Sequence, residues 1–84
     1  MNRIEYKFPY INRLYREVNH QIRYYTLQIY KTLFGEYILE KKYGSIKNKR
    51  PTGVKREFFL SLGDAVKATA LQIEAKLKRG YTLA

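Results

Sequence analysis

A cluster of basic residues around one tyrosine is the part of this 84-residue sequence best suited to chemistry. In chain order the cluster comprises Lys42, Tyr43, Gly44, Ser45, Lys47, Lys49, Arg50, Lys55 and Arg56. Lysine and arginine side chains neutralise phosphates, and an aromatic ring beside uncovered glycine backbone stacks on a base or presses against a sugar. These residue types predict a nucleic-acid-binding site. The alternative interpretation is a sheet-packing tyrosine beside an ordinary solubilising loop.

The overall charge favours the same class of partner. Seventeen lysines and arginines face seven aspartates and glutamates, which gives a formal net charge of +10. Such an excess is typical of proteins that bind polyanions, although a lysine-rich surface also serves solubility alone. A membrane-surface protein would concentrate this charge on an amphipathic helix beside exposed apolar residues, and the one clear helix lacks that pattern. We therefore expect nucleic acid, and DNA in particular, as the partner.

The sequence offers little for catalysis. His20 is the only histidine, it lies in a predicted turn, and no serine or cysteine motif stands near it. The acidic residues are spread singly, without metal-ligand spacing or a pair suited to general acid and base work. The absence of cysteine excludes zinc–thiolate sites, disulfides and thiol nucleophiles. We predict a protein that is not an enzyme and has no catalytic residue, no metal and no cofactor.

Two strands joined by a turn are predicted over residues 23–46, and they carry the first half of the cluster. Apolar and polar residues alternate from Tyr25 to Ile29, as in a half-buried strand. Gly35 marks the turn, and the alternation then continues to Gly44. A glycine within such a pattern marks a bulge or the close approach of another backbone.

A basic loop and a returning strand follow. Residues 47–53 contain no apolar side chain other than Pro51, and Gly53 adds a second turn signal. Residues 54–60 resume strand chemistry and are predicted to run antiparallel to residues 36–46. This hairpin is expected to bring the basic cluster to one end of the sheet.

A helix of about residues 62–79 completes the chain. Ser61 is its predicted N-cap, with Asp64 in the first turn, and Gly80 is its predicted left-handed C-terminal cap. Its apolar stripe is predicted to comprise Val66, Ala70, Ile73 and Leu77, flanked by Leu62, Ala65 and Thr69. Lys67, Gln72, Glu74 and Lys78 are predicted to face water. This stripe would pack the helix on the sheet.

The N-terminal third is less determined. Residues 1–10, which include Pro9, predict an extended arm or a short edge strand. Residues 11–25 have apolar spacing that fits a helix as well as strands, and periodicity alone does not decide between them. A helix would begin without a good cap, so a strand over residues 14–18 and a turn over residues 19–22 are preferred.

Several short motifs in this order resemble the WGR domain, a family found in poly(ADP-ribose) polymerases and in small bacterial proteins. The motifs are Tyr24-Tyr25, Leu33-Phe34-Gly35-Glu36-Tyr37, Tyr43-Gly44-Ser45-Ile46, and Lys76 to Tyr81. The resemblance covers roughly residues 14–81. It implies an α+β fold in which a twisted antiparallel sheet of about four strands has one long C-terminal helix packed across it.

The resemblance also assigns roles within the cluster. In the polymerases the tryptophan and arginine of the Trp-Gly-Arg tripeptide lie against the sugar–phosphate backbone at a DNA end, which implies that Tyr43 takes the tryptophan role. Ser45 stands where the family often has arginine, and it carries no charge. Lys42 or Lys47 is then the candidate to supply the cation, although Lys47 itself stands where a glycine commonly follows the isoleucine.

These inferences together predict a single WGR-like domain over residues 11–84 that acts as a monomer. No segment is apolar and long enough to span a bilayer or to form a signal peptide, which favours a cytoplasmic protein. The expected function is a non-catalytic module that contacts the DNA backbone or a DNA end without base-sequence specificity. The alternative is a protein-docking module that uses a tyrosine-rich face of the sheet, since tyrosine is favoured at interface hot spots.

Overall fold

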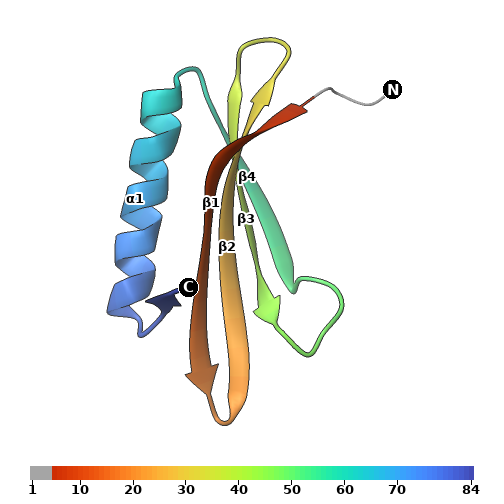
Figure 1. Ribbon diagram of the computed structural model, residues 1–84, viewed down its shortest axis with the longest axis vertical. Coiled ribbons are helices and arrows are strands. Elements are labelled where there is room, and N and C mark those ends of the chain that lie inside the picture. Colours follow the sequence, from red (N-terminus) through yellow and green to blue (C-terminus); the bar gives the residue numbers. More distant parts are fainter. Residues whose placement is uncertain (1–4) are drawn as a thin grey trace.

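The computed structural model describes the backbone of residues 5–84 and the side chains of residues 11–84. Its elements in chain order are β1 (Glu5–Val18), β2 (Gln21–Thr32), β3 (Tyr37–Ser45), β4 (Gly53–Phe59), α1 (Leu62–Lys78) and β5 (Thr82–Leu83). The strands form one five-stranded antiparallel sheet in the order β4-β3-β2-β1-β5, and α1 lies across one face of it (Figure 1). The predicted α+β fold is confirmed, with five strands in place of about four.

The additional strand is β5, which follows the helix. Leu83 pairs with Leu14 of β1, and Thr82 pairs with Tyr15. Two residues are too few to show a periodic pattern, so this strand could not be predicted from the sequence. Because β5 pairs with β1, the chain just after Tyr81 is held against the sheet, and this determines the position of Tyr81.

The predicted N-terminal arm is described only in part. Residues 1–4 lie outside the described residues, and the backbone of residues 5–10 belongs to β1. Residues 5–7 pair with β2, and the register shifts before pairing resumes at Ile11. The division into an arm over residues 1–10 and a domain over residues 11–84 stays a prediction.

Residues 11–25 form strands, and the helical alternative for this segment is wrong. β1 and β2 remain paired to the end of the hairpin, where Val18 lies opposite Gln21. The turn residues Asn19 and His20 have φ angles of 51° and 65°. A two-residue hairpin turn of type I′ requires this left-handed conformation at both positions. The chain therefore reverses within two residues, which a continuous helix does not allow.

The sheet has two unlike faces because successive side chains of a strand point to opposite sides. The face under α1 holds the hydrophobic core, formed by Leu14, Tyr25, Leu27, Ile29 and Leu39 of the strands with Ala65 of the helix. Tyr24 and Tyr30 of β2 lie on the other face, beside a polar network around Glu40. The tyrosines of β2 are thus divided between the core and the far face.

Both ends of α1 are capped as predicted. The Ser61 hydroxyl accepts a hydrogen bond from the Asp64 N–H at 3.1 Å. At the other end Gly80 has a φ of 93°, and the Tyr81 N–H donates to the Lys76 carbonyl at 3.1 Å. This left-handed cap turns the chain back toward the sheet.

The face of α1 that meets the sheet is rotated from the predicted stripe. Val66 is 37% exposed and Leu77 is 45% exposed, whereas Ala65 and Thr69 are buried. The residues that face the sheet are Leu62, Ala65, Thr69, Gln72, Ile73 and Lys76. The sheet-facing stripe thus includes the residues predicted to flank it, Leu62, Ala65 and Thr69. The prediction that Gln72 faces water is wrong, because the sheet-facing side of the helix also carries polar residues that line a pocket.

We expect the two leucines Leu27 and Leu77 to differ in their effect on stability. Leu27 is fully buried, so Leu27→Ala removes packing and leaves a cavity that costs about 2–5 kcal/mol of unfolding free energy. Leu77→Ala removes a side chain that is already half in water and should cost less than about 1 kcal/mol. Urea denaturation of both variants checks this. Equal losses would mean that the helix is rotated differently in solution.

Candidate nucleic-acid interface

The structure places the predicted site residues in three locations. Tyr43 and Lys55 lie on the face of the sheet under α1. Lys42 and Arg56 lie on the opposite face, next to Glu40. The end of β3 and the loop after it hold the others, which are Gly44, Ser45, Lys47, Lys49 and Arg50.

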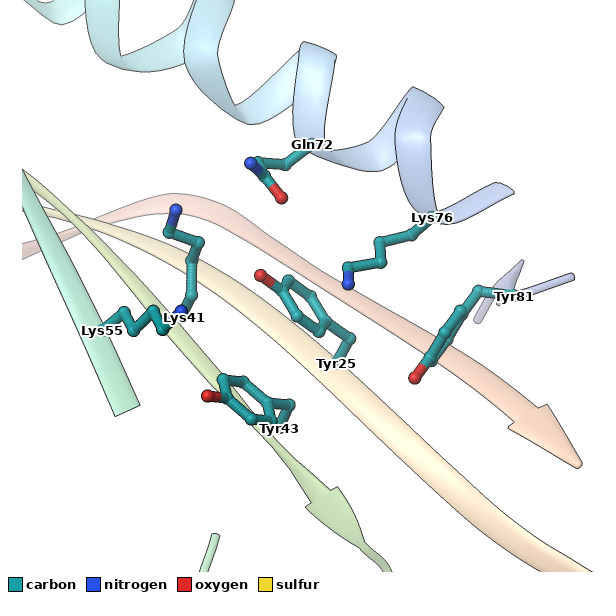
Figure 2. Close-up of a pocket in the computed structure, with 7 residues that line it drawn as sticks. All are labelled: Tyr25, Lys41, Tyr43, Lys55, Gln72, Lys76 and Tyr81. Atoms are coloured by element: carbon teal, nitrogen blue, oxygen red, sulfur yellow. The ribbon is translucent and has the colours of Figure 1, made fainter. Parts of the chain in front are cut away.

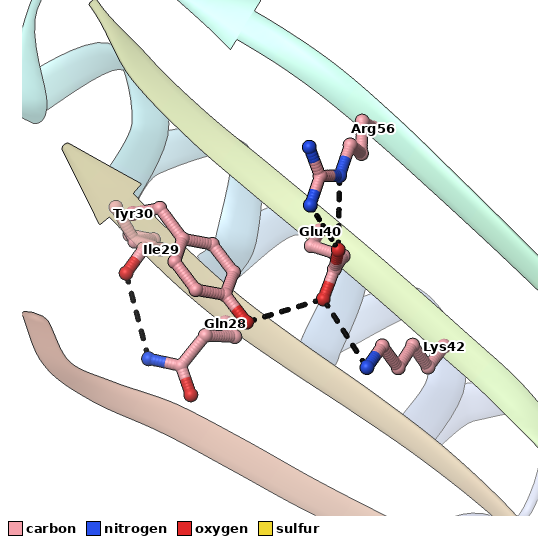
Figure 3. Close-up of polar contacts among 6 residues, drawn as sticks. All are labelled: Gln28, Ile29, Tyr30, Glu40, Lys42 and Arg56. Atoms are coloured by element: carbon pink, nitrogen blue, oxygen red, sulfur yellow. Dashed lines mark hydrogen bonds and ion pairs between the residues drawn. The ribbon is translucent and has the colours of Figure 1, made fainter. Parts of the chain in front are cut away.

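Lys42 and Arg56 are engaged by a buried carboxylate (Figure 3). Glu40 is only 5% exposed, and its Oε2 lies 2.8 Å from the Arg56 Nη2 and accepts from the Arg56 Nε at 2.9 Å. Its Oε1 lies 3.6 Å from the Lys42 Nζ and accepts from the Tyr30 hydroxyl at 3.3 Å. Both cations are therefore on the far face from Tyr43 and are partly neutralised, instead of joining the loop cations on one surface as the sequence analysis expected.

The pKa of Glu40 reflects these partners. Burial alone raises the pKa, but the hydrogen bond from Arg56 and the charges of Lys42 and Arg56 outweigh it, so the pKa lies below its usual value. The carboxylate is therefore ionised at neutral pH and holds β2, β3 and β4 together across the far face.

The tyrosine of the cluster packs within the sheet. The Tyr43 ring stacks on Tyr25 with 5.7 Å between the ring centroids and an interplanar angle of 10°. On β4 it lies against Gly53, where a Cβ atom would be 2.3 Å from the Tyr43 Cζ. Only a glycine leaves room for the ring there. The packing role considered from the sequence therefore applies to the ring, while the Tyr43 side chain also lines a pocket under α1.

Gly44 is a point of close approach, as its position in the strand predicted. A Cβ atom at Gly44 would lie 2.9 Å from the Thr52 nitrogen, and the Thr52 N–H donates to the Tyr43 carbonyl at 2.8 Å. The glycine thus lets the end of the loop close onto β3. Its backbone is covered by the loop, contrary to the expectation that it would lie open beside the tyrosine. Ser45 is also buried, at 8% exposed.

The loop itself presents three exposed cations, Lys47, Lys49 and Arg50. None of them pairs with a carboxylate in the part of the chain that the structure describes. The loop begins with the Asn48 N–H bonded to the Ser45 carbonyl at 3.1 Å and ends with the Thr52 bond to β3. It lies toward the same end of the sheet as the C-terminal end of α1 (Figure 1).

A pocket of about 280 Å³ lies between α1 and the sheet. It is lined by Tyr25, Lys41, Tyr43, Lys55, Gln72, Lys76 and Tyr81 (Figure 2). The sequence analysis placed only Tyr43 and Lys55 in the site. Strand pairing identifies Tyr25 and Lys41, which lie opposite Tyr43 and Lys55. For Lys76 and Tyr81 the signal in the sequence was the Lys76 to Tyr81 motif, and Gln72 is identified only by its position on the sheet-facing side of α1.

Lys76 occupies the centre of this arrangement. Its Nζ lies 4.3 Å from the ring centroid of Tyr25 and 5.8 Å from that of Tyr81. Burial and the nearby charges of Arg79, Lys41 and Lys55 lower its pKa. The same crowding leaves a concentration of positive charge at this end of the molecule.

The family model for the WGR domain matches residues 10–84, from within β1 to the end of the chain. The chain belongs to the WGR domain family. WGR domains are generally nucleic-acid-binding modules, and the family is not catalytic by itself. Comparisons with curated proteins and with solved structures gave no match.

By the resemblance drawn from the sequence, the name-giving tripeptide of this WGR domain corresponds to residues 43–45 at the end of β3. The tyrosine is packed against Tyr25 and Gly53, the glycine accommodates Thr52, and the serine is buried. Positive charge is supplied by neighbouring elements instead of by the tripeptide. Within the described residues, no helix has the length and apolar character needed to cross a membrane.

The ion pairs of Glu40 predict a specific acid sensitivity. Because the folded-state pKa of Glu40 is below its usual 4.5, the contribution of this carboxylate to stability is present above that value and is lost as pH falls through the folded-state pKa. Glu40→Gln should therefore lose less stability than the unmodified protein between about pH 6 and pH 3. The measurement is urea denaturation at both pH values. Glu74→Gln is the control, because Glu74 is exposed and its Oε1 lies 3.7 Å from the Lys78 Nζ in a solvent-exposed ion pair.

The contact between Gly53 and Tyr43 predicts an energetic coupling. Gly53→Ala would push the Tyr43 ring out of place and should cost about 1–3 kcal/mol of unfolding free energy, as overpacking does. In a Tyr43→Ala background the same change meets no ring and should cost much less. A double-mutant cycle by urea denaturation measures the difference. Additive effects would show that the two residues do not touch in solution.

Proposed function

We propose that this WGR domain binds DNA through contacts to the sugar–phosphate backbone, or at a DNA end, without reading base sequence. The observation that carries the proposal is a group of cations without a carboxylate partner among the described residues, gathered around the pocket and the loop. These are Lys47, Lys49, Arg50, Lys55 and Lys76.

Unpaired cations are suited to phosphates in a way that paired ones are not. A lysine that neutralises a phosphate releases a condensed counterion from DNA, and this release drives binding. Lys42 and Arg56 already face the Glu40 carboxylate, so a phosphate would compete with that carboxylate for them. We therefore place the main contact surface on the loop and on the side of the sheet under α1, with Lys42 and Arg56 as minor contributors.

Backbone contact is favoured over base reading by the kind of side chain available. Base edges in the major groove are read by arginine, asparagine and glutamine presented together on an inserted element. The exposed side of α1 instead mixes Lys67, Leu71, Glu74 and Lys78. The loop offers flexible cations, which contact phosphates of any sequence equally.

Tyr43 and the buried Ser45 set the geometry of this surface. The Tyr43 ring is held by Tyr25 and Gly53, so it presents a fixed edge to a sugar or phosphate. Ser45 lies under the loop and is a poor candidate for direct contact. Lys47, two residues later and exposed, is the better candidate for the charge that arginine supplies in other members of the family.

Replacing Lys47, Lys49 and Arg50 together with glutamine tests the proposal. Affinity for duplexes of unrelated sequence should fall about equally, and the slope of log affinity against log salt should become shallower by roughly 0.9 for each lost phosphate contact. Fluorescence anisotropy with two labelled duplexes between about 50 and 200 mM salt provides the measurement.

The matched control replaces Arg13, Lys31 and Lys67 with glutamine, which removes the same charge from exposed positions away from the loop. This variant should bind nearly as well as the unmodified protein. Equal loss in the two triple variants would show that net charge, and not the loop, attracts DNA. Saturable association with a protein partner that is insensitive to salt would favour the docking alternative.

A further inference from the structure

The pocket under α1 has an unusual lining. It presents the ammonium groups of Lys41, Lys55 and Lys76, the hydroxyls of three tyrosines and the amide of Gln72, and no carboxylate. No hydrogen bond or ion pair joins one of these described side chains to another, and Lys41 alone has an acidic partner, Glu57. The pocket therefore offers many hydrogen-bond donors and few competing acceptors.

The flat surfaces of the tyrosine rings are largely used within the protein. Tyr25 stacks on Tyr43, and it also meets Tyr81 edge to face at 6.3 Å and 72°. The Lys76 ammonium lies over Tyr25, and the Arg16 guanidinium lies 5.9 Å from the Tyr81 centroid. A planar base has little ring surface left on which to stack. Figure 2 shows the Tyr25 and Tyr43 hydroxyls directed toward the side of the pocket that holds Lys41 and Lys55.

The positive charge in the pocket is only partly compensated, by the Glu57 carboxylate that pairs with Lys41. Burial and the charges of Arg79, Lys41 and Lys55 disfavour the protonated form of Lys76 and lower its pKa. The repulsion among these cations is relieved when an anion binds among them. The dipole at the C-terminal end of α1 opposes an anion, although the Tyr81 N–H already bonds the Lys76 carbonyl there.

Size restricts the anion further. About 280 Å³ is near the lower limit of the roughly 300–1,000 Å³ of small-molecule sites. The sheet forms the floor, α1 forms a wall, and Tyr81 closes one end (Figure 2). A continuous nucleic-acid strand does not fit inside such a space, but a phosphate group on a small carrier does.

We propose that this pocket, which lies within the surface assigned above to DNA and rests on that assignment, is a binding site for a phosphate monoester of about the size of a sugar phosphate. Lys55 and Lys76 neutralise its charge, and the hydroxyls of Tyr25 and Tyr43 donate to its oxygens. The Gln72 amide contacts the sugar-sized group that carries the phosphate. The site does not depend on the DNA-binding loop, because Lys47, Lys49 and Arg50 are not among its lining residues. The monoester is either a free small molecule or a phosphate at the end of a strand.

Isothermal titration calorimetry of the full chain with ribose 5-phosphate tests the proposal, with ribose and sodium sulfate as comparison ligands. We expect saturable 1:1 binding of ribose 5-phosphate, none of ribose and weaker binding of sulfate. Lys76→Gln and Lys55→Gln should each weaken binding about tenfold, as loss of a charge-assisted hydrogen bond does. Tyr43→Phe, which removes only the hydroxyl, should weaken it several-fold.

Two controls separate this site from the basic loop of Lys47, Lys49 and Arg50. The triple loop variant should lose DNA affinity and keep ribose 5-phosphate affinity, and Lys67→Gln should change neither. Melting curves confirm that each variant is folded. If Lys76→Gln is unstable, Lys55→Gln still tests the proposal, because Lys55 is exposed on the edge strand β4. No binding at millimolar ribose 5-phosphate, or equal binding of ribose, overturns the proposal. So does loss of binding in the triple loop variant.

A pair of duplexes identical except for terminal phosphates distinguishes the two sources. If Lys76→Gln abolishes a preference for the phosphorylated duplex, the pocket receives the end of a strand. If the duplexes bind equally while ribose 5-phosphate still binds through Lys76, the pocket receives a free small molecule. If neither the phosphorylated duplex nor ribose 5-phosphate depends on Lys76, the proposed pocket is wrong.

Discussion

The contact of Tyr43 with Gly53 is the constraint on which the candidate site depends. A side chain at position 53 would collide with the ring, so the glycine lets the ring lie across β4 and stack on Tyr25. The stacked pair forms the floor of the pocket under α1. The residue after Tyr43 is also a glycine, which admits Thr52 and closes the basic loop onto β3. One pair of glycines therefore fixes both the pocket and the loop beside it.

Strand alternation then divides the charges that the sequence places close together. Neighbours such as Lys41 and Lys42 point to opposite faces, where Lys41 meets Glu57 and Lys42 meets Glu40. Lys55 and Arg56 are separated in the same way, and within the described part of the chain only Arg56 has a carboxylate partner. One face is thus held by the network around Glu40, while the face under α1 has the Lys41–Glu57 pair beside the unpaired cations Lys55 and Lys76. A run of basic residues in a strand suggests about twice the charge that either face of the sheet carries, because successive side chains point to opposite faces.

The fold was predictable because most of its elements carry local signals. Alternation marked the strands, and the capping residues Ser61 and Gly80 marked the helix ends. The rotation of α1 was not predictable from hydrophobicity, because its sheet-facing stripe includes Gln72 and Lys76, which face the pocket instead of the core. The site was predictable only in part for the same reason. Tyr43 and Lys55 are on hairpin strands that the sequence aligns, but Lys76 and Tyr81 reach them through tertiary packing alone.

The resemblance implies that Tyr43 and Ser45 stand in place of the family's tryptophan and arginine, and this packing is compatible with that replacement. A phenol ring fits between Tyr25 and Gly53 and still extends a hydroxyl to the pocket, so aromatic contact and hydrogen bonding come from one residue. A buried serine accommodates the closed loop, which brings Lys47, Lys49 and Arg50 beyond it into solvent. Positive charge is thereby carried by the loop a few residues further along the chain and by Lys76 of α1, instead of by the tripeptide. A surface built this way separates the group that positions a ligand from the groups that attract it, and each is open to substitution without loss of the other.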